Sequence, residues 1–270
     1  MTQQNFSIRT DCNLSLPAKI YYSQNKGTLG TLIYFHGGGL IFGEYDDLPK
    51  DYIDVLAEHF DILLVSYRLL PESNLKDIFI DIKNIYNYSK SLGKNIYVFG
   101  RSAGGYLSYL ISKHFEVQGA IIFYGYYNFK HSAFKTLPKD QIQYSHLLFP
   151  SIEQFNVRDY KTVNEPPNPR FLLYLYYRHL NMWLDKLQVG LNDSKFYLTD
   201  EDLLRMPKTC LVHCKNDADV PFSYSESAAK LISNSKLIEL NLNTHDFDRT
   251  VTHKNIRVYE EVVNFFKQKS

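Results

Sequence analysis

The chain has 270 residues, a length that suits one large domain or a domain with an insertion. Its formal net charge is +1, with both signs spread along the chain, so neither nucleic acid nor an anionic membrane is expected as a partner. The hydrophobic fraction of 44% is ordinary for a soluble protein, and no stretch is apolar enough to span a bilayer.

The N-terminal residues and the number of cysteines indicate the cellular compartment of the protein. Residues 1–7 lack a basic region followed by an apolar stretch, so no secretory signal peptide is expected. Three cysteines are an odd number, which argues against a disulfide framework. These features predict a cytoplasmic protein.

Short β-branched or aromatic runs alternate with longer helical patterns along the chain. Strands are predicted at residues 18–24, 31–36, 62–67, 95–100, 117–124, 209–214 and 236–241. Helices are predicted at residues 48–59, 75–92, 103–114, 223–233 and 256–269. This alternation implies right-handed crossovers and an α/β fold with a mostly parallel sheet flanked by helices. The first two strands have no helix between them, so we expect them to form an antiparallel edge.

The alternation stops over residues 126–206. Residues 165–169 are proline-rich, and residues 171–177 are aromatic at helical length. A helical spacing continues through Leu180, Trp183, Leu184 and Leu187. Because structureless loops of this length are rare, we predict a helical cap here, inserted into a core domain of residues 1–125 and 207–270. The alternative is a set of extra core helices with no lid function.

Ser102 is the candidate nucleophile. An apolar run ends at Phe99, Gly100-Arg101-Ser102-Ala103-Gly104 follows, and then a helix begins. Strand, tight turn and helix are the context in which G-x-S-x-G forms a nucleophile elbow. The hydroxyl then stands at a helix N-terminus, which favours developing negative charge. By itself the five-residue pattern could also be a fortuitous turn.

Three successive glycines follow His36 at the end of another apolar run. Their bare backbone can donate N–H groups to an oxyanion, so we expect the oxyanion hole to combine Gly37 or Gly38 with Ala103. No Gly-Lys-Ser/Thr follows, which argues against a phosphate loop. His36 is expected to orient the loop and not to act as a general base.

An acid and a histidine follow the last two predicted strands. Asp217 and Asp219 lie in the loop after residues 209–214, where a carboxylate can reach a histidine on the next loop. His245 lies past the last strand and ahead of the final helix, whereas the alternative, His253, falls at the start of that helix. The residues alone leave the choice between the two acids open.

Cys210, His213 and Cys214 lie close together in one predicted strand. Alternation sends the two thiols to one face and the imidazole to the other, so the three do not converge on an ion. We expect buried, unreactive thiols, and the prediction includes no metal and no cofactor.

Three motifs in this order resemble the α/β-hydrolase superfamily, most closely the hormone-sensitive-lipase-like esterases and small carboxylesterases. They begin at His36 (H-G-G-G), at Ser66 (S-Y-R-L-L-P-E, similar to D-Y-R-L-A-P-E) and at Gly100 (G-R-S-A-G-G). The resemblance implies an eight-stranded sheet, with a triad at its C-terminal edge in the order Ser102, Asp217, His245.

The acid loop departs from that family. It lacks the D-x-L-x-D form, and residues 217–221 instead resemble the D-x-x-V-P loop of dienelactone-hydrolase-like and prolyl-oligopeptidase-like enzymes. In those enzymes the first Asp is the acid, which favours Asp217 over Asp219. Cys214 also stands where such enzymes often have glycine.

Together these features predict a serine hydrolase that cleaves a small ester through an acyl-enzyme. A peptidase or thioesterase with the same triad is a second hypothesis. A non-catalytic ligand-binding protein is a third, and the retained triad argues against it. The sequence does not define the acyl group, the alcohol or the oligomeric state.

Overall fold

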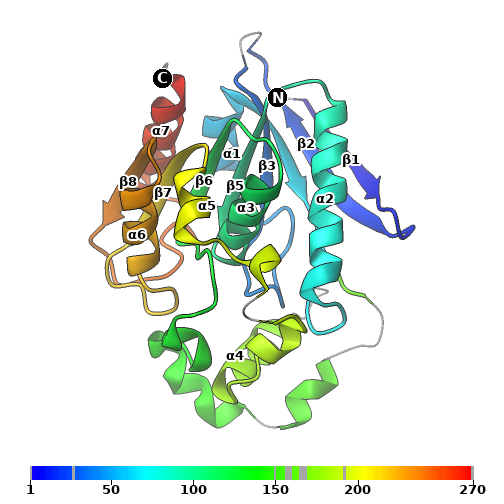
Figure 1. The fold of residues 1–270 in the computed structure, drawn as a ribbon, viewed down its shortest axis with the longest axis vertical. Coiled ribbons are helices and arrows are strands. Elements are labelled where there is room, and N and C mark those ends of the chain that lie inside the picture. The colour runs from blue at the N-terminus through cyan, green and yellow to red at the C-terminus, as the bar shows by residue number, and fades with distance from the viewer. Residues whose placement is uncertain are drawn as a thin grey trace.

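The centre of the computed structural model is an eight-stranded sheet in the order β1-β2-β4-β3-β5-β6-β7-β8 (Figure 1). The structure describes residues 2–25, 28–148, 150–155, 160–163, 169–190 and 193–268. The strands are β1 (Thr2–Arg9), β2 (Ser15–Tyr22), β3 (Gly30–Phe35), β4 (Phe60–Val65), β5 (Ile96–Arg101), β6 (Gly119–Phe123), β7 (Lys208–Cys214) and β8 (Ser235–Leu240). The two pairs that include β2 are antiparallel, and all the others are parallel. The α/β-hydrolase architecture is thereby confirmed.

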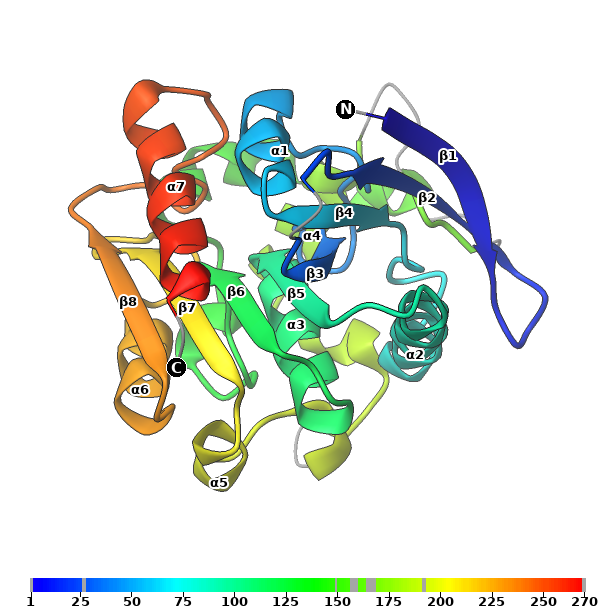
Figure 2. The same ribbon diagram turned by 90° about the horizontal axis from the view of Figure 1, so that it is seen from above.

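Helices cover both faces of the sheet. The α-helices of the described residues are α1 (Lys50–Ala57), α2 (Leu75–Ser91), α3 (Ala103–His114), α4 (Arg170–His179), α5 (Asp200–Leu204), α6 (Ser223–Leu231) and α7 (His253–Lys267). Figure 2 shows α1 and α7 on one face, and α2, α3 and α6 on the other. An apolar core lies on each side, which explains why β3 and β4 are buried along their whole length. No helix in the described part of the chain is long and apolar enough to cross a membrane.

Helix boundaries follow from local capping. At the start of α2 the Asn74 side chain accepts the Asp77 N–H, and the Asp77 carboxylate accepts the Asn74 N–H. Thr252 caps α7 in the same position, so His253 is the first residue of that helix, as its place in the sequence indicated. The last residue predicted for this helix, 269, lies outside the described residues.

The expected pairing of the first two predicted strands is wrong. β4 lies between β2 and β3, and pairs antiparallel with β2 and parallel with β3. All six side chains of β4 are buried, so this strand belongs inside the sheet, with a partner on each side. The antiparallel edge is instead made by β2 and β1, a strand that the sequence did not reveal. β1 is mostly exposed and polar, so it lacks the alternating apolar pattern of a half-buried strand.

Residues 126–206 are called here the β6–β7 segment. Figure 1 shows α4 beyond the carboxyl ends of the parallel strands, whereas α5 lies beside the sheet next to α6. Besides α4 and α5, the segment forms short 3₁₀ helices: Ser132–Lys135, Lys139–Leu147, Pro150–Phe155, Leu184–Leu187 and Ser194–Phe196. The predicted helical spacing beyond Leu180 does not continue α4, because Asn181 adopts a left-handed conformation with φ 55° and breaks the helix. Residues 165–168 of the proline-rich stretch lie outside the described residues.

Candidate active site

Ser102 occupies the turn between β5 and α3. Its φ of 53° and ψ of −117° place it in a sparsely populated region of backbone space, which concentrates at functional sites. The turn can be this tight because Gly100 has no side chain: a Cβ there would lie 1.9 Å from the Gly104 carbonyl oxygen. The strand–turn–helix geometry therefore presents the Ser102 hydroxyl at the N-terminus of α3.

His245 and Asp217 complete a hydrogen-bonded chain with this serine. His245 Nε2 lies 2.8 Å from Ser102 Oγ, and His245 Nδ1 lies 2.7 Å from Asp217 Oδ2. Since a carboxylate only accepts, Nδ1 carries a proton, and in the neutral form of the ring Nε2 accepts the Ser102 hydroxyl hydrogen. Burial of the imidazole disfavours its charged form, but the Asp217 carboxylate outweighs burial and raises the pKa of His245 to about 9.

The carboxylate of Asp217 is held by four donors. Its Oδ1 accepts the backbone N–H groups of Asp219 at 2.8 Å and Val220 at 2.9 Å. Its Oδ2 accepts from His245 and also from His213 Nε2, at 3.0 Å. Burial alone would raise the pKa of this carboxyl, but the two histidines hold it well below its usual range. The group is therefore ionised and fixed in orientation.

His213 is a part of this site that the sequence did not reveal. Its Nε2 lies 3.0 Å from both Asp217 Oδ2 and the Val220 carbonyl oxygen, so Nε2 carries the proton. Its Nδ1 accepts from the buried Ser225 hydroxyl at 2.8 Å. Sequence reasoning considered this histidine only with the neighbouring thiols. Its position four residues before Asp217 was the available signal.

Asp219 points away from the imidazole. Its carboxylate accepts from the Tyr174 hydroxyl at 3.0 Å and from the Arg178 guanidinium at 2.7 Å. Of the two candidate acids, the structure brings Asp217 to His245, whereas Asp219 joins the loop to α4.

The glycine loop after β3 lies against Ser102. A Cβ on Gly37 would come within 3.4 Å of the Ser102 Cβ. Gly38 has a φ of 100°, and its carbonyl accepts from Ile41 and Phe42 N–H, both at 3.0 Å. Gly37 thus lies on one side of Ser102, while Ala103 follows it in the chain at the start of α3.

The His36 side chain contacts the backbone of the glycine loop. Its Nδ1 lies 2.7 Å from the Gly37 carbonyl oxygen, and its ring stacks on Tyr67 with a centroid distance of 4.3 Å. The Tyr67 hydroxyl donates to the His36 carbonyl at 2.8 Å. Burial lowers the pKa of His36, so the ring is neutral and donates from Nδ1.

Cys210 and Cys214 lie in the core beside α1 and α7, while His213 reaches the opposite face of β7. Burial raises the pKa of each thiol to about 12. Within the described ranges, no three His, Cys, Asp or Glu side chains are arranged to hold a metal ion.

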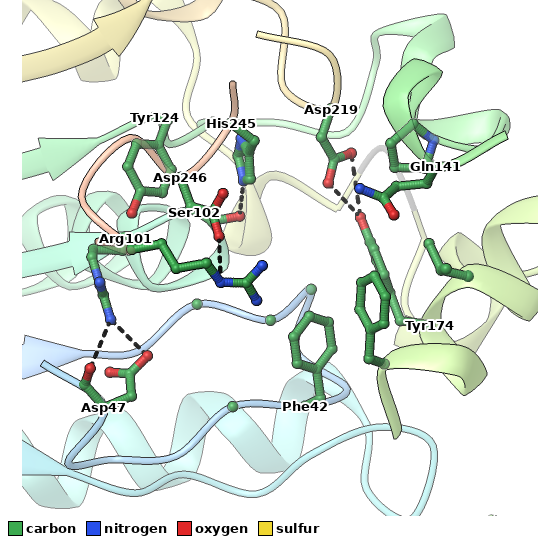
Figure 3. A pocket seen from close by; sticks show the side chains of 18 of the residues that line it. Phe42, Asp47, Arg101, Ser102, Tyr124, Gln141, Tyr174, Asp219, His245 and Asp246 are labelled. Carbon is green, nitrogen blue, oxygen red and sulfur yellow. Dashed lines mark hydrogen bonds and ion pairs between the residues drawn. The ribbon is translucent and has the colours of Figure 1, made fainter. Parts of the chain in front are cut away.

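A cavity of about 350 Å³ opens beside Ser102 and His245. Figure 3 shows its two sides. Arg101, Asp47 and Asp246 lie on the side of the sheet, and Phe42 and Tyr174 lie opposite. The apolar side is completed by Phe171 and Leu175 of α4, so the β6–β7 segment forms part of the wall.

Side chains of the β6–β7 segment form hydrogen bonds with the backbone of the loops that line the site. Trp183 Nε1 donates to the Gly39 carbonyl at 2.9 Å. Arg170 Nε donates to the Ile41 carbonyl at 2.6 Å, and its guanidinium also pairs with Glu72. The glycine loop therefore depends on this segment for hydrogen-bond donors.

A serine in a strand–helix turn above a sheet of this order defines the class of α/β hydrolases. The chain belongs to the alpha/beta hydrolase fold family, whose sequence model matches residues 32–248. It is 33% identical to a protein of unknown function from Staphylococcus aureus subsp. aureus Mu50, whose crystal structure has a TM-score of 0.93, with 99% of this chain and 98% of that chain covered.

Relatives with described activities are more distant. A probable carboxylesterase M8 of a Phoma species is 25% identical over 272 aligned positions, and the match covers 83% of this chain and 81% of that protein. The 3-O-acetylpapaveroxine carboxylesterase CXE2 of Papaver somniferum is 28% identical over 131 aligned positions, and the match covers 39% of this chain. That match spans only 42% of the poppy protein. The family is carboxylesterase-like, as the three motifs indicated.

Proposed function

We propose that this protein is a serine carboxylesterase with Ser102 as nucleophile, His245 as general base and acid, and Asp217 as the acid of the triad. The hydrogen-bonded chain from Ser102 Oγ through His245 to Asp217 carries the proposal, with contacts of 2.8 and 2.7 Å. The carboxylesterase relatives support an ester as the substrate.

The reaction has two steps. Ser102 Oγ attacks the ester carbonyl carbon as its proton passes to His245 Nε2. The oxyanion accepts N–H bonds from Gly37 or Gly38 and from Ala103. The ester C–O bond then breaks, and His245 gives its proton to the leaving alcohol. Water attacks the acyl-enzyme, loses a proton to His245 and releases the carboxylic acid, and the proton returns to Ser102.

The cavity supports a small substrate with an apolar arm. Its volume of about 350 Å³ lies at the lower end of ligand sites. Phe42, Phe171 and Leu175 offer apolar surface opposite the polar side, where they suit an acyl chain. We further propose that residues 126–206 act as a cap, since α4 forms this part of the wall.

The test combines covalent labelling with a substrate panel. We expect a fluorophosphonate probe to label the protein at Ser102, and p-nitrophenyl acetate to be hydrolysed faster than acyl-CoAs or aminoacyl amides. Ser102→Ala should abolish both labelling and turnover while the protein stays folded by circular dichroism. Full activity in Ser102→Ala would refute the assignment, and a preference for amides or thioesters would replace esterase with peptidase or thioesterase.

A further inference from the structure

A buried ion pair joins the two loops that carry the nucleophile and the histidine. Arg101 directly precedes Ser102, and Asp248 lies three residues beyond His245. Arg101 NH1 lies 3.4 Å from Asp248 Oδ2, with the Asp248 side chain fully buried and that of Arg101 9% exposed. Neither residue is part of the triad, so their burial calls for a separate explanation.

Tyr124 connects this pair to the imidazole. It follows β6 with a φ of 38°, a conformation that is costly for a bulky residue. Its hydroxyl donates to Asp248 Oδ1 at 2.6 Å. Its ring meets the His245 imidazole edge-to-face, with centroids 4.8 Å apart and planes at 64°. The strained backbone thus aims the ring at His245, and Asp248 holds it there.

Further buried groups fix the ion pair in place. Asp47 Oδ2 accepts from the Arg101 guanidinium at 2.6 Å. The Tyr259 hydroxyl of α7 donates to Asp248 Oδ2 at 2.5 Å. Arg101 therefore has two carboxylate partners and Asp248 has three donors, which gives the network little freedom to move.

We propose that Arg101, Asp248 and Tyr124 are positioning residues that hold His245 against Ser102 through the contact of the Tyr124 ring with the imidazole. Asp217 fixes the imidazole at Nδ1 but leaves the ring free to tilt about that hydrogen bond. The Tyr124 ring opposes this tilt, and Arg101 anchors the arrangement to the end of β5, directly before Ser102. The inference rests on the proposed function, because its consequence is the rate of proton transfer between Ser102 and His245.

Two substitutions test the network without leaving a buried charge unpaired. Tyr124→Phe keeps the ring and removes its bond to Asp248. Asp248→Asn removes the negative charge, but Arg101 keeps Asp47 as a partner. Tyr86→Phe is the matched control, since Tyr86 is a buried tyrosine of α2 whose hydroxyl donates to the Glu116 carbonyl at 3.0 Å, away from the cavity.

We expect kcat and the fluorophosphonate labelling rate to fall on the order of tenfold in both variants, with KM changed less than about twofold, because a small misplacement of the base slows proton transfer. Tyr86→Phe should keep the kcat of the unsubstituted protein, even if its melting temperature falls as much as that of Tyr124→Phe or Asp248→Asn. The His245 Hε1 proton resonance should also shift in Tyr124→Phe and Asp248→Asn, since it reports the position of the neighbouring ring.

The outcomes separate the two proposals. An active unsubstituted protein whose Tyr124→Phe and Asp248→Asn variants match Tyr86→Phe in kcat would overturn the positioning role alone. A protein that neither hydrolyses esters nor reacts with the probe at Ser102 would overturn the proposed function and this inference together.

Discussion

Replacing Asp217 with Asn should change the pH dependence of the site. With Asp217 in place, the pKa of His245 is raised from its ordinary 6.5 to about 9. That rise corresponds to about 3 kcal/mol of preference for the charged imidazole. A neutral amide in place of the Asp217 carboxylate cannot supply this preference, and burial, which disfavours the charged ring, then dominates. The pKa of His245 should therefore fall below 6.5 in Asp217→Asn.

The sign of the rate effect follows from the proposed role of His245 as general base. His245 must be neutral to accept the Ser102 proton, so kcat/KM and the labelling rate of the unsubstituted protein should rise with pH and level off above about 9. In Asp217→Asn the rise should occur below 6.5. The plateau should be lower by about 10⁴-fold, because the amide no longer fixes the Nδ1 proton as a carboxylate does or stabilises the imidazolium.

The free energy of unfolding should also depend on the ionisation of His245, but it should fall with rising pH where the reaction rate increases. A pKa raised on folding stabilises the native state fully below the unfolded value and loses this contribution as pH rises through the folded value. The free energy of unfolding should therefore fall by about 3 kcal/mol between pH 6.5 and about 9, and this fall should be absent in Asp217→Asn. Chemical denaturation at several pH values measures it.

The assay is the fluorophosphonate labelling rate from about pH 5 to about pH 10 for the unsubstituted protein, Asp217→Asn and Asp219→Asn. Asp219→Asn is the matched control, because Asp219 bonds to Tyr174 and Arg178 and not to His245. Its inflection should move less than that of Asp217→Asn. An unmoved inflection in Asp217→Asn, or an equal movement in both variants, would refute this account of His245.

Two further substitutions test the walls of the site. Gly38→Ala should lower kcat about 10²- to 10³-fold, because its Cβ would lie 1.8 Å from the Phe42 carbonyl oxygen and displace the glycine loop, which we propose binds the oxyanion. Gly93→Ala, also at a positive φ but with open space around it, should keep full kcat in the same assay, and equal losses would contradict the loop's role. Phe171→Ala should raise kcat/KM for p-nitrophenyl hexanoate relative to acetate on the order of tenfold, because it widens the apolar wall. An unchanged ratio would place the acyl chain elsewhere.

Local chemistry explains what could be predicted from the sequence. Ser102 lies in a turn between a strand and a helix that are adjacent in the sequence, so this strand–turn–helix context can be predicted from one short stretch of residues. The positions of Asp217 and His245 follow from parallel strands, whose carboxyl ends meet at one edge of the sheet. The structure brings these three side chains together as that reasoning anticipated.

The features that escaped prediction depend on contacts distant in the chain or on weak local patterns. The place of β4 between β2 and β3 depends on strand pairing that no single stretch specifies. The 3₁₀ helices of the β6–β7 segment have no 3.6-residue apolar period to detect. Asp248 and Arg101 are 147 residues apart and look like surface charges until the fold buries them together.

The bond from Trp183 to the Gly39 carbonyl has a consequence for how this enzyme family can be recombined. The buried backbone of the glycine loop takes a donor from the β6–β7 segment, so the two share an interface and are not separable modules. A chimera carrying a foreign segment without this donor leaves that carbonyl unpaired, at a cost of about 1–3 kcal/mol. Directed evolution of substrate range should therefore exchange the loop and the segment together, or vary side chains within the segment while Trp183 is kept.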